Sequence, residues 1–546
     1  MTAHTPLERF YHWEKNTPKQ PFLRQPVAGK WTVYTYQQAG NEARRIAQAL
    51  KKLNLPPQSN IAILSKNCAH WIMADLAIWM AGHVSIPIYP TLSATGIHYI
   101  LEHSEARAIF LGKLDSFVKQ RDAIAPDIYQ ISFPFYGPNE GDAWDDLLQN
   151  EPLMESALPS GEQVASIMYS SGTTGAPKGV ELTFGAFDFT GQSLVRNFGI
   201  TKPERFFSYL PLSHIAERAY IEIGVLYSGS SISFTESLDK FAENLREVQP
   251  TLFGGVPRIF AKFQEGILSK MPQQKLDRLL SIPIASAIMK RVIQKKLGFS
   301  KTHLIVGGAA PIPVSLLKWF ASLGVEIREI YGMTENCGYS HGDHGDIVHI
   351  GTVGRPWPGI EVKFTEEGEI LVRHPGLMRG YYKDAETTRN VFTADGFLKT
   401  GDKGVADAAG YLTITGRVKD QFKTDKAKFI APAPIEMKFS SNPDIDSICV
   451  VGMGIPQPIA LVVLSAMAVD KSKDMVMEGL TFTLQQVNAS LEHYERIEKV
   501  VIMREGWTVE NGFMTPSLKV KRNEIEKVHL AKYPVWYKHE AKIVWE

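Results

Sequence analysis

The chain has little cysteine, and this excludes two classes of small stabilised protein. Only three cysteines occur in 546 residues (Cys68, Cys337 and Cys449), and no two of them form a CxxC pair. A disulfide scaffold needs a framework of paired cysteines and a zinc ribbon needs CxxC pairs, so we expect neither. A chain of this length can bury several cores without such links. So few cysteines are typical of a reducing compartment.

The chain also has no excess of charge and no long apolar run. Lys and Arg number 59 and Asp and Glu 58, so the formal net charge is +1, and we expect no nucleic-acid partner. The N-terminal residues lack the apolar core of a signal peptide. Asp75, His83 and Pro87 interrupt the most apolar stretch, residues 71–90, which is too broken for a membrane span of about 20 residues. We expect a cytoplasmic protein and leave peripheral membrane contact and oligomeric state open.

Hydrophobic periodicity predicts an α/β fold for the first part of the chain, which has no internal repeat. An amphipathic helix is predicted at 36–53 and a buried helix at 71–81, with strands at 60–64, 84–88 and 108–111. Strands separated by helices indicate a mostly parallel sheet. A predicted helix at 219–227 continues the pattern.

The predicted secondary-structure pattern changes in the last third of the chain. After Thr352, short strands with glycine turns indicate a small β-rich subdomain. A new unit begins at Arg417, with strands at 447–451 and 460–463, a helix at 480–497 and a final strand at 499–503. We therefore expect a large N-terminal domain over residues 1–416 and a small α+β domain over 417–546, with the boundary near 416–423.

Residues 270–301 are strongly basic. The segment has a helical pattern broken at Pro272 and Pro283. Lysines and arginines in such a pattern usually form a solvated helix face, and we expect that here.

One loop carries the groups expected of a phosphate-binding site. The apolar run 164–168 indicates a strand, and YSSGTTGAPKG follows at 169–179. Glycines let the backbone turn tightly and present N–H groups to an anion, and the lysine adds a positive charge. The loop is not a Walker A motif, because GxxxxGK[ST] is absent. The candidate phosphate ligands are Ser170, Ser171, Gly172, Thr173, Thr174, Gly175 and Lys178.

This loop resembles the signature loop of the adenylate-forming superfamily, which includes acyl-CoA synthetases, luciferases and peptide-synthetase adenylation domains. Further segments are similar to the family's motifs, follow the family's order and cover nearly the whole chain. They are PLSHIAER at 211–218, GGVPR at 254–258, GGAAP at 307–311, YGMTE at 331–335, TGD at 400–402, GR at 416–417 and TPSLK at 515–519. The chain most resembles long-chain acyl-CoA synthetases of the soluble or bubblegum-like kind.

The resemblance implies an ATP-dependent reaction. A carboxylate is a poor acyl donor because its leaving group would be oxide, whereas the mixed anhydride with AMP has a good leaving group. Two anions must approach each other, so the site needs cations and Mg²⁺. The implied products are acyl-AMP and pyrophosphate, and then acyl-CoA and AMP, with a fatty acid, ATP and CoA as substrates. The alternative is a fatty acyl-AMP ligase that passes the acyl group to a carrier protein or another acceptor.

The resemblance also assigns roles to individual residues. Lys519 is expected to bridge the carboxylate and the α-phosphate, and Glu335 to hold the metal. Asp402 and Arg417 are expected to bind the ribose. The expected catalytic set is Lys519, Thr173, Glu335 and His214, where His214 borders the acyl pocket. The adenine-side ATP contacts are expected from Gly308, Ala309, Ala310, Tyr331, Gly332, Met333 and Thr334.

In this family the C-terminal domain swings between the two half-reactions. By position, Lys419 matches the hinge residue. Ala427 stands where the family usually has a glycine in a loop that lines the CoA tunnel. Either the alanine is strained in a glycine-like geometry, or the loop has shifted and Lys426 and Lys428 contact CoA. We favour the second interpretation, in which Ala427 has an ordinary backbone conformation.

Two rival interpretations concern residues 338–349. Gly338-Tyr-Ser-His-Gly342 fits the GxSxG elbow of serine hydrolases, but no helical pattern follows it, as that elbow requires. A metal site could be drawn from His341, Asp343, His344, Asp346 and His349, but no HExxH pattern occurs and a polar loop explains these residues as well.

Overall fold

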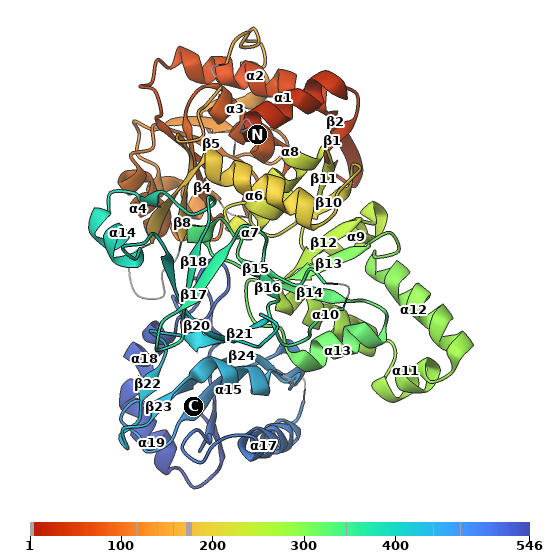
Figure 1. Cartoon of the computed structure of the whole chain (residues 1–546), viewed down its shortest axis with the longest axis vertical. Coiled ribbons are helices and arrows are strands. Elements are labelled where there is room, and N and C mark those ends of the chain that lie inside the picture. The colour runs from red at the N-terminus through yellow and green to blue at the C-terminus, as the bar shows by residue number, and fades with distance from the viewer. Residues whose placement is uncertain are drawn as a thin grey trace.

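The computed structural model describes residues 5–115, 117–138, 140–156, 158–170, 177–345, 347–440, 442–469 and 471–546. Figure 1 shows the N-terminal layers in the upper part of the molecule and the C-terminal unit, in blue, below them. The expected α/β class is confirmed.

The largest sheet has eight strands in the order β19-β9-β8-β4-β3-β5-β6-β7. Strands β8 to β7 of this order are parallel. Strand β9 pairs antiparallel with β8, and the edge strand β19 pairs antiparallel with β9. The predicted strands at 60–64, 84–88 and 108–111 are confirmed. The strands are β3 (Asn60–Leu64), β4 (Val84–Ile88), β5 (Ala108–Leu111), β6 (Tyr129–Ser132), β7 (Asp142–Ala143), β8 (Val164–Ser170), β9 (Lys178–Thr183) and β19 (Gly380–Tyr381).

The helices beside this sheet follow from their sequence patterns. Thr35 caps α2 through a reciprocal capping box with Gln38, and α2 buries only its apolar side. Every residue of α3 is buried, because apolar residues lie on all sides of that helix. The helices of this region are α1 (Pro6–Asn16), α2 (Tyr36–Lys52), α3 (Ala69–Met80), α4 (Ala94–Ser104), α5 (Trp144–Leu147) and α6 (Phe184–Asn197).

A buried ion pair explains the charge inside the apolar stretch 71–90. Asp75 of α3 accepts two hydrogen bonds, of 3.0 and 2.8 Å, from the Nη2 group of Arg218, and both side chains are fully buried. The guanidinium also lies over the rings of Trp71 and Trp79. The pair joins α3 to a π-helix, η3 (Arg218–Ile223), where the sequence predicted an α-helix; α7 (Ile215–Glu217) and α8 (Gly224–Ser228) flank it.

Two further sheets complete the main body of the large domain. One has the order β10-β11-β1-β2, and the other has the order β12-β13-β14-β15-β16. The strands are β1 (Pro21–Val27), β2 (Lys30–Thr35), β10 (Arg205–Ser208), β11 (Ser231–Phe234), β12 (Leu252–Gly255), β13 (Leu304–Gly307), β14 (Ile327–Tyr331), β15 (His341–Gly342) and β16 (Arg355–Pro356).

A group of helices lies along the second of these sheets. Two of them, α11 and α12, extend away from the body at the right of Figure 1. The helices are α9 (Phe241–Val248), α10 (Pro257–Leu268), α11 (Gln273–Leu280), α12 (Pro283–Leu297) and α13 (Val314–Ser322).

The expected β-rich subdomain is an antiparallel sheet of the order β17-β18-β20-β21. Its strands are β17 (Glu361–Phe364), β18 (Glu369–Arg373), β20 (Leu398–Ala406) and β21 (Leu412–Arg417), with α14 (Ala385–Val391) nearby.

The C-terminal unit is built on a sheet of the order β24-β25-β26-β27 with an apolar cluster on each face. Val450 and Val462 enter one cluster and Val451 and Leu461 the other, as strand alternation requires. Its strands are β22 (Phe422–Lys423), β23 (Phe429–Ile430), β24 (Ile445–Val451), β25 (Ile459–Leu464), β26 (Val500–Ile502) and β27 (Ile543–Trp545), and its helices are α15 (Pro432–Phe439), α16 (Ala466–Val469), α17 (Lys473–Ala489), α18 (Arg522–His529) and α19 (Tyr533–Lys538).

Two sequence predictions for this unit were wrong. The strand predicted at 499–503 is not the last one, because β27 adds a further edge to the sheet beside β26. The helix predicted at 480–497 starts earlier and ends earlier, as α17. Ser472 caps α17 by accepting a hydrogen bond from the N–H of Met475, and this polar start lies before the apolar run used for the prediction.

Candidate active site

Asp402 joins three sequence motifs at one place. Strands β20 and β21 pair Asp402 directly with Arg417. The Asp402 Oδ1 atom accepts a 2.8 Å hydrogen bond from the Arg417 Nε, and Oδ2 accepts a 2.7 Å bond from the Tyr331 hydroxyl at the end of β14. Asp402 is buried, and its negative charge raises the pKa of the Arg417 guanidinium. The predicted ribose-binding pair and the predicted adenine-side tyrosine are therefore in contact.

Glu335 lies on a short 3-10 turn, Thr334–Asn336, directly after β14. Its Oε1 atom accepts a 2.9 Å hydrogen bond from the Tyr381 hydroxyl, and its backbone carbonyl accepts from the N–H of Met378. Burial raises the pKa of the Glu335 carboxyl, while the Tyr381 bond and the charge of Arg417 oppose the shift. The turn needs Gly332, because a Cβ there would lie 2.4 Å from the backbone of Gly338.

Lys178 and Ser170 face each other across the hairpin of β8 and β9. The Lys178 Nζ donates a 3.3 Å hydrogen bond to the Thr387 hydroxyl and lies 5.1 Å from the centre of the Tyr381 ring. Tyr381 therefore connects Lys178 to Glu335. The other predicted phosphate ligands, Ser171, Gly172, Thr173, Thr174 and Gly175, lie outside the described residues.

The loop after β13 holds the remaining adenine-side candidates. Strands β13 and β14 are parallel neighbours, so their carboxyl ends lie at the same sheet edge. Gly308, Ala309 and Ala310 follow β13 there, and Tyr331 ends β14, with Gly332, Met333 and Thr334 after it. The Gly308 N–H donates to the Gly255 carbonyl, and a Cβ on Gly308 would lie 2.9 Å from the Ile330 oxygen. Ligands of α/β sheets bind at this carboxyl edge.

Lys519 comes from the C-terminal unit and is presented by a tight turn. The Lys519 N–H donates to the Thr515 hydroxyl, the Lys519 carbonyl accepts from the Thr515 N–H, and Leu518 has a φ of +60°. Lys519 keeps a large exposed surface. Even so, the protein around its ammonium and the positive charge of Arg417 lower the pKa of Lys519, against the opposing charges of Asp402 and Glu335.

The charge of the Lys519 ammonium also affects His214. Burial, and then the charge of Lys519, lower the pKa of His214 to about 3. The ring is therefore neutral at pH 7, and its Nδ1 accepts a hydrogen bond from the N–H of Ala216. The charge of Lys519 is thus coupled electrostatically to groups from four separate motifs, namely His214, Glu335, Asp402 and Arg417.

Sequence reasoning missed two residues that shape this site. Tyr381, described above, lies on a two-residue strand, which is too short to give a sequence pattern. Glu217 lies inside the PLSHIAER motif, and its Oε1 accepts from the Ser208 hydroxyl at 2.7 Å, the Tyr209 N–H at 3.0 Å and the Asn67 amide at 3.3 Å. Burial raises the pKa of Glu217 to about 8. Glu217 thereby fixes the segment that leads to His214.

The two units are also joined by an ion pair away from the site. The Arg258 Nη2 group, in the GGVPR motif, donates to Asp446 at 2.8 Å and to the Ser447 hydroxyl at 3.1 Å. Lys419 lies on the exposed turn that follows β21.

The favoured interpretation of Ala427 was wrong. Ala427 lies in the hairpin between β22 and β23 and has a φ of +59°, which is the left-handed region that glycine adopts without cost. The hairpin has therefore kept the geometry expected for a glycine, with alanine in its place. Lys426 and Lys428 on either side are exposed, and the Lys428 ammonium lies 5.5 Å from the centre of the Tyr494 ring.

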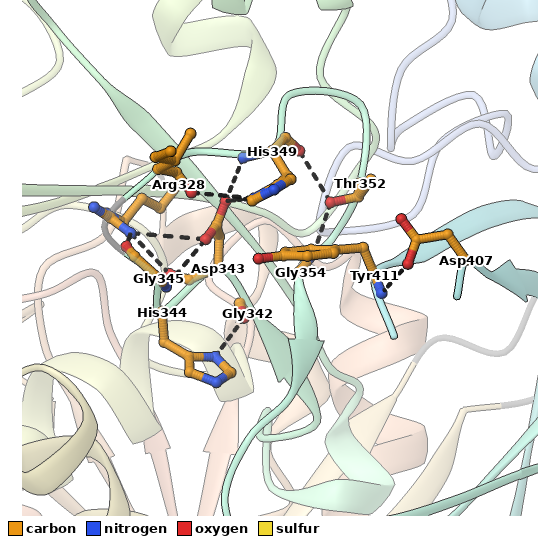
Figure 2. A network of polar contacts seen from close by, with 11 residues as sticks. Arg328, Gly342, Asp343, His344, Gly345, His349, Thr352, Gly354, Asp407 and Tyr411 are labelled. Carbon is orange, nitrogen blue, oxygen red and sulfur yellow. Dashed lines mark hydrogen bonds and ion pairs between the residues drawn. The ribbon is translucent and has the colours of Figure 1, made fainter. Parts of the chain in front are cut away.

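The rival metal site does not form among the described residues. Figure 2 shows Asp343 surrounded by donors: it accepts from the His349 N–H at 2.6 Å, and its other oxygen lies 3.7 Å from Arg328. His344 points away and donates to the Gly342 carbonyl, and the His349 ring stacks on Tyr411. No group of three or more potential ligands occurs in the part of the chain that the structure describes.

The serine-hydrolase interpretation also fails. Ser340 is fully buried and lies before a two-residue strand, β15, with no helix following that strand directly. A nucleophile elbow needs an exposed serine between a strand and a helix.

Comparisons with known proteins agree with this geometry. Residues 10–382 match the family described as AMP-binding enzyme, and residues 420–534 match the AMP-binding enzyme C-terminal domain. The chain is 28% identical to the long-chain-fatty-acid–CoA ligase FadD15 of Mycobacterium bovis over 94% of each chain. It is 29% identical to the peroxisomal long chain acyl-CoA synthetase 7 of Arabidopsis thaliana, over 90% of this chain and 80% of that one.

A solved structure shows the same fold. The adenylation domain of a carboxylate reductase from Mycobacterium chelonae superposes with a TM-score of 0.84 at 22% identity, over 99% of this chain and 92% of that chain.

Proposed function

Because the chain belongs to the AMP-binding enzyme family, we propose that it activates a fatty acid with ATP and then transfers the acyl group to CoA. The first half-reaction yields acyl-AMP and pyrophosphate, and the second yields acyl-CoA and AMP. The names of the two relatives above support a long-chain acid as the substrate.

The observation that carries this proposal is the cluster around Asp402. A buried carboxylate held by Tyr331 and Arg417 is suited to accept hydrogen bonds from ribose hydroxyls. The ammonium of Lys519 is close enough for Asp402, Glu335 and Arg417 to shift its pKa. A mobile positive charge at this point would neutralise the carboxylate and the α-phosphate as they approach each other.

Other residues complete the proposed ATP and acyl contacts. The ammonium of Lys178 would bind the outer phosphates of ATP, and the neutral His214 ring would line the acyl pocket. After adenylation, the C-terminal domain would rotate about Lys419, withdraw Lys519 and admit CoA, whose thiol attacks the acyl carbonyl and expels AMP. Lys426 and Lys428 carry positive charges that suit the phosphates of CoA.

Glu335 is suited to hold Mg²⁺. Magnesium prefers oxygen ligands and is usually held by one or two carboxylates together with substrate phosphates, so a larger protein cluster is not required. Tyr381 fixes one oxygen of Glu335. The ion would reduce the negative charge of the triphosphate.

We place the reaction in the cytoplasm, with peripheral membrane contact. Within the described residues, no helix combines the length and the apolar character needed to cross a bilayer.

The test is pyrophosphate release from ATP with saturated acids from butyrate to arachidate, each with and without CoA. We expect release with long acids and formation of acyl-CoA when CoA is present. Asp402→Asn should abolish release, and Asp395→Asn, an exposed aspartate paired with Lys363 in the same domain, should not. Acyl-AMP without acyl-CoA would favour the carrier-protein alternative, and no release with any acid would refute the proposal.

A further inference from the structure

Helices α11 and α12 with their flanking residues, 270–301, form what we call the basic arm. Eight of the chain's 59 Lys and Arg residues lie in this segment, against one of its 58 Asp and Glu residues, Asp277. The arm therefore carries a large positive charge in a chain that is nearly neutral overall. In Figure 1 it extends away from the large domain.

One side of the basic arm is explained by packing. Leu276, Ile293 and Leu297 are buried in the apolar cluster below the arm, and Met289 packs against that cluster. Gln273 at the start of α11 accepts a 2.9 Å hydrogen bond from the indole of Trp319 on α13. These contacts fix the arm on the body and use one face of α12.

The opposite face of α12 is apolar as well and is left exposed. Ile284 is 77% exposed, Ile288 58% and Val292 41%, and Ile282 just before the helix is 51% exposed. A helix packed on one side normally shows polar residues on the other, and isolated exposed apolar residues need no explanation, but a stripe does.

Cationic side chains continue the same exposed face of α12 beyond the isoleucines. Ile284, Ile288, Arg291 and Lys295 follow each other at spacings of four, three and four residues, so they share one face of the helix. Arg291, Lys295 and Lys296 are exposed. The arm therefore presents isoleucines near its tip and cations along the same face.

We propose that the basic arm docks on an anionic membrane surface. Isoleucines that enter the headgroup boundary and cations that meet lipid phosphates are the two contributions that hold interfacial helices on membranes. This charge complementarity favours anionic lipid over a second copy of this nearly neutral chain, and the isoleucines favour lipid over nucleic acid. The inference rests on the proposed function in one respect: a long-chain fatty acid partitions into bilayers, so an enzyme docked there meets its substrate.

The first test is co-sedimentation of the whole protein with vesicles, without ATP or fatty acid. We expect binding to phosphatidylcholine vesicles that contain phosphatidylglycerol, weaker binding to phosphatidylcholine alone, and release by salt. Lys295→Ala with Lys296→Ala should lower the partition coefficient about 30-fold, since each cation near the surface contributes about a factor of five. Ile284→Ser with Ile288→Ser should lower it about tenfold or more.

The matched control is Lys51→Ala with Lys52→Ala. These two lysines are exposed in the last turn of α2, as Lys295 and Lys296 are in the last turn of α12, and α2 lies far from the basic arm in Figure 1. The control variant should bind vesicles like the unmodified protein. All variants change exposed residues, so their thermal unfolding should be unchanged.

Four results would overturn the proposal. They are no binding to anionic vesicles, binding that the arm variants leave intact, binding that depends on the lysines and not on the isoleucines, and an oligomeric mass that falls in the isoleucine variants. The last result would make a second copy the occupant. Pyrophosphate release with a long-chain acid dissolved in detergent, without vesicles, reports the proposed function separately, because that assay requires no membrane.

Discussion

Lys519 is the residue whose removal should separate the two half-reactions. Lys519→Ala deletes an ammonium that the C-terminal unit brings to the large domain. Arg417, whose charge acts on Lys519, is held by Asp402 in a 2.8 Å ion pair, and Lys178 donates a hydrogen bond to Thr387. Neither is free to take the place of the missing charge.

The expected loss follows from this geometry. Removing one fixed charge or donor that stabilises a transition state costs about 10²–10³-fold in rate, or roughly 3–4 kcal/mol. We therefore expect pyrophosphate release to fall by that factor in Lys519→Ala. Thioester formation from supplied acyl-AMP and CoA should change little, because the proposed rotation about Lys419 withdraws the lysine in that step.

The assay follows pyrophosphate and acyl-CoA separately, with Lys521→Ala as the control. Lys521 lies in the same C-terminal loop, so its replacement removes an equal charge two residues away. A loss of equal size in both half-reactions of Lys519→Ala, or an equal loss in the control, would refute the assignment.

Two measurements against pH test the same role of Lys519. Because the charge of Lys519 helps to lower the pKa of His214, the pKa of His214 should rise in Lys519→Ala, while burial still keeps it below 6.5. The bridging role needs a protonated lysine, and the pKa of Lys519 is below its ordinary value of 10.5. Adenylation should therefore decline at alkaline pH, and Lys519→Arg should move that decline to higher pH. A histidine NMR titration and a pH profile measure these shifts.

Further predictions concern the hinge, the hairpin, the buried glutamate and the ion pair between the two units. Lys419→Pro fixes φ near −65°, so it should keep pyrophosphate release and lose acyl-CoA formation; parallel loss of both would exclude a hinge there. Ala427→Gly relieves a left-handed alanine that costs about 1 kcal/mol, so acyl-CoA formation should rise by up to about fivefold, and an unchanged rate would mean that this step does not feel the strain. Glu217 keeps a proton up to about pH 8 in the folded protein, whereas the unfolded chain releases it near 4.5. The thermal stability of the unmodified protein should therefore fall as pH rises through that range, and Glu217→Gln should remove this part of the slope. Arg258→Ala should slow pyrophosphate release by no more than about fivefold, because partly exposed ion pairs contribute about 0.2–1 kcal/mol, and Asp446→Ala should add little to it in the double variant.

The sequence alone determined the α/β class, several strands of the large sheet and the identity of most candidate site residues. Strands β3, β4 and β5 are short apolar runs buried inside a parallel sheet, and such runs can be predicted as strands without knowledge of their neighbours. The motif residues Tyr331, Asp402 and others could be named because each lies in a contiguous segment that resembles a family motif.

The tertiary structure decided which of these residues touch and in what state. Tyr381 connects Glu335 to Lys178 only because β19 pairs with β9, some 200 residues earlier in the chain. The left-handed backbone of Ala427 could not be predicted from the sequence either, since the identity of an alanine does not fix its φ. Contacts between distant segments, and backbone geometry set by the hairpin around a residue, depend on the folded path of the chain rather than on local composition.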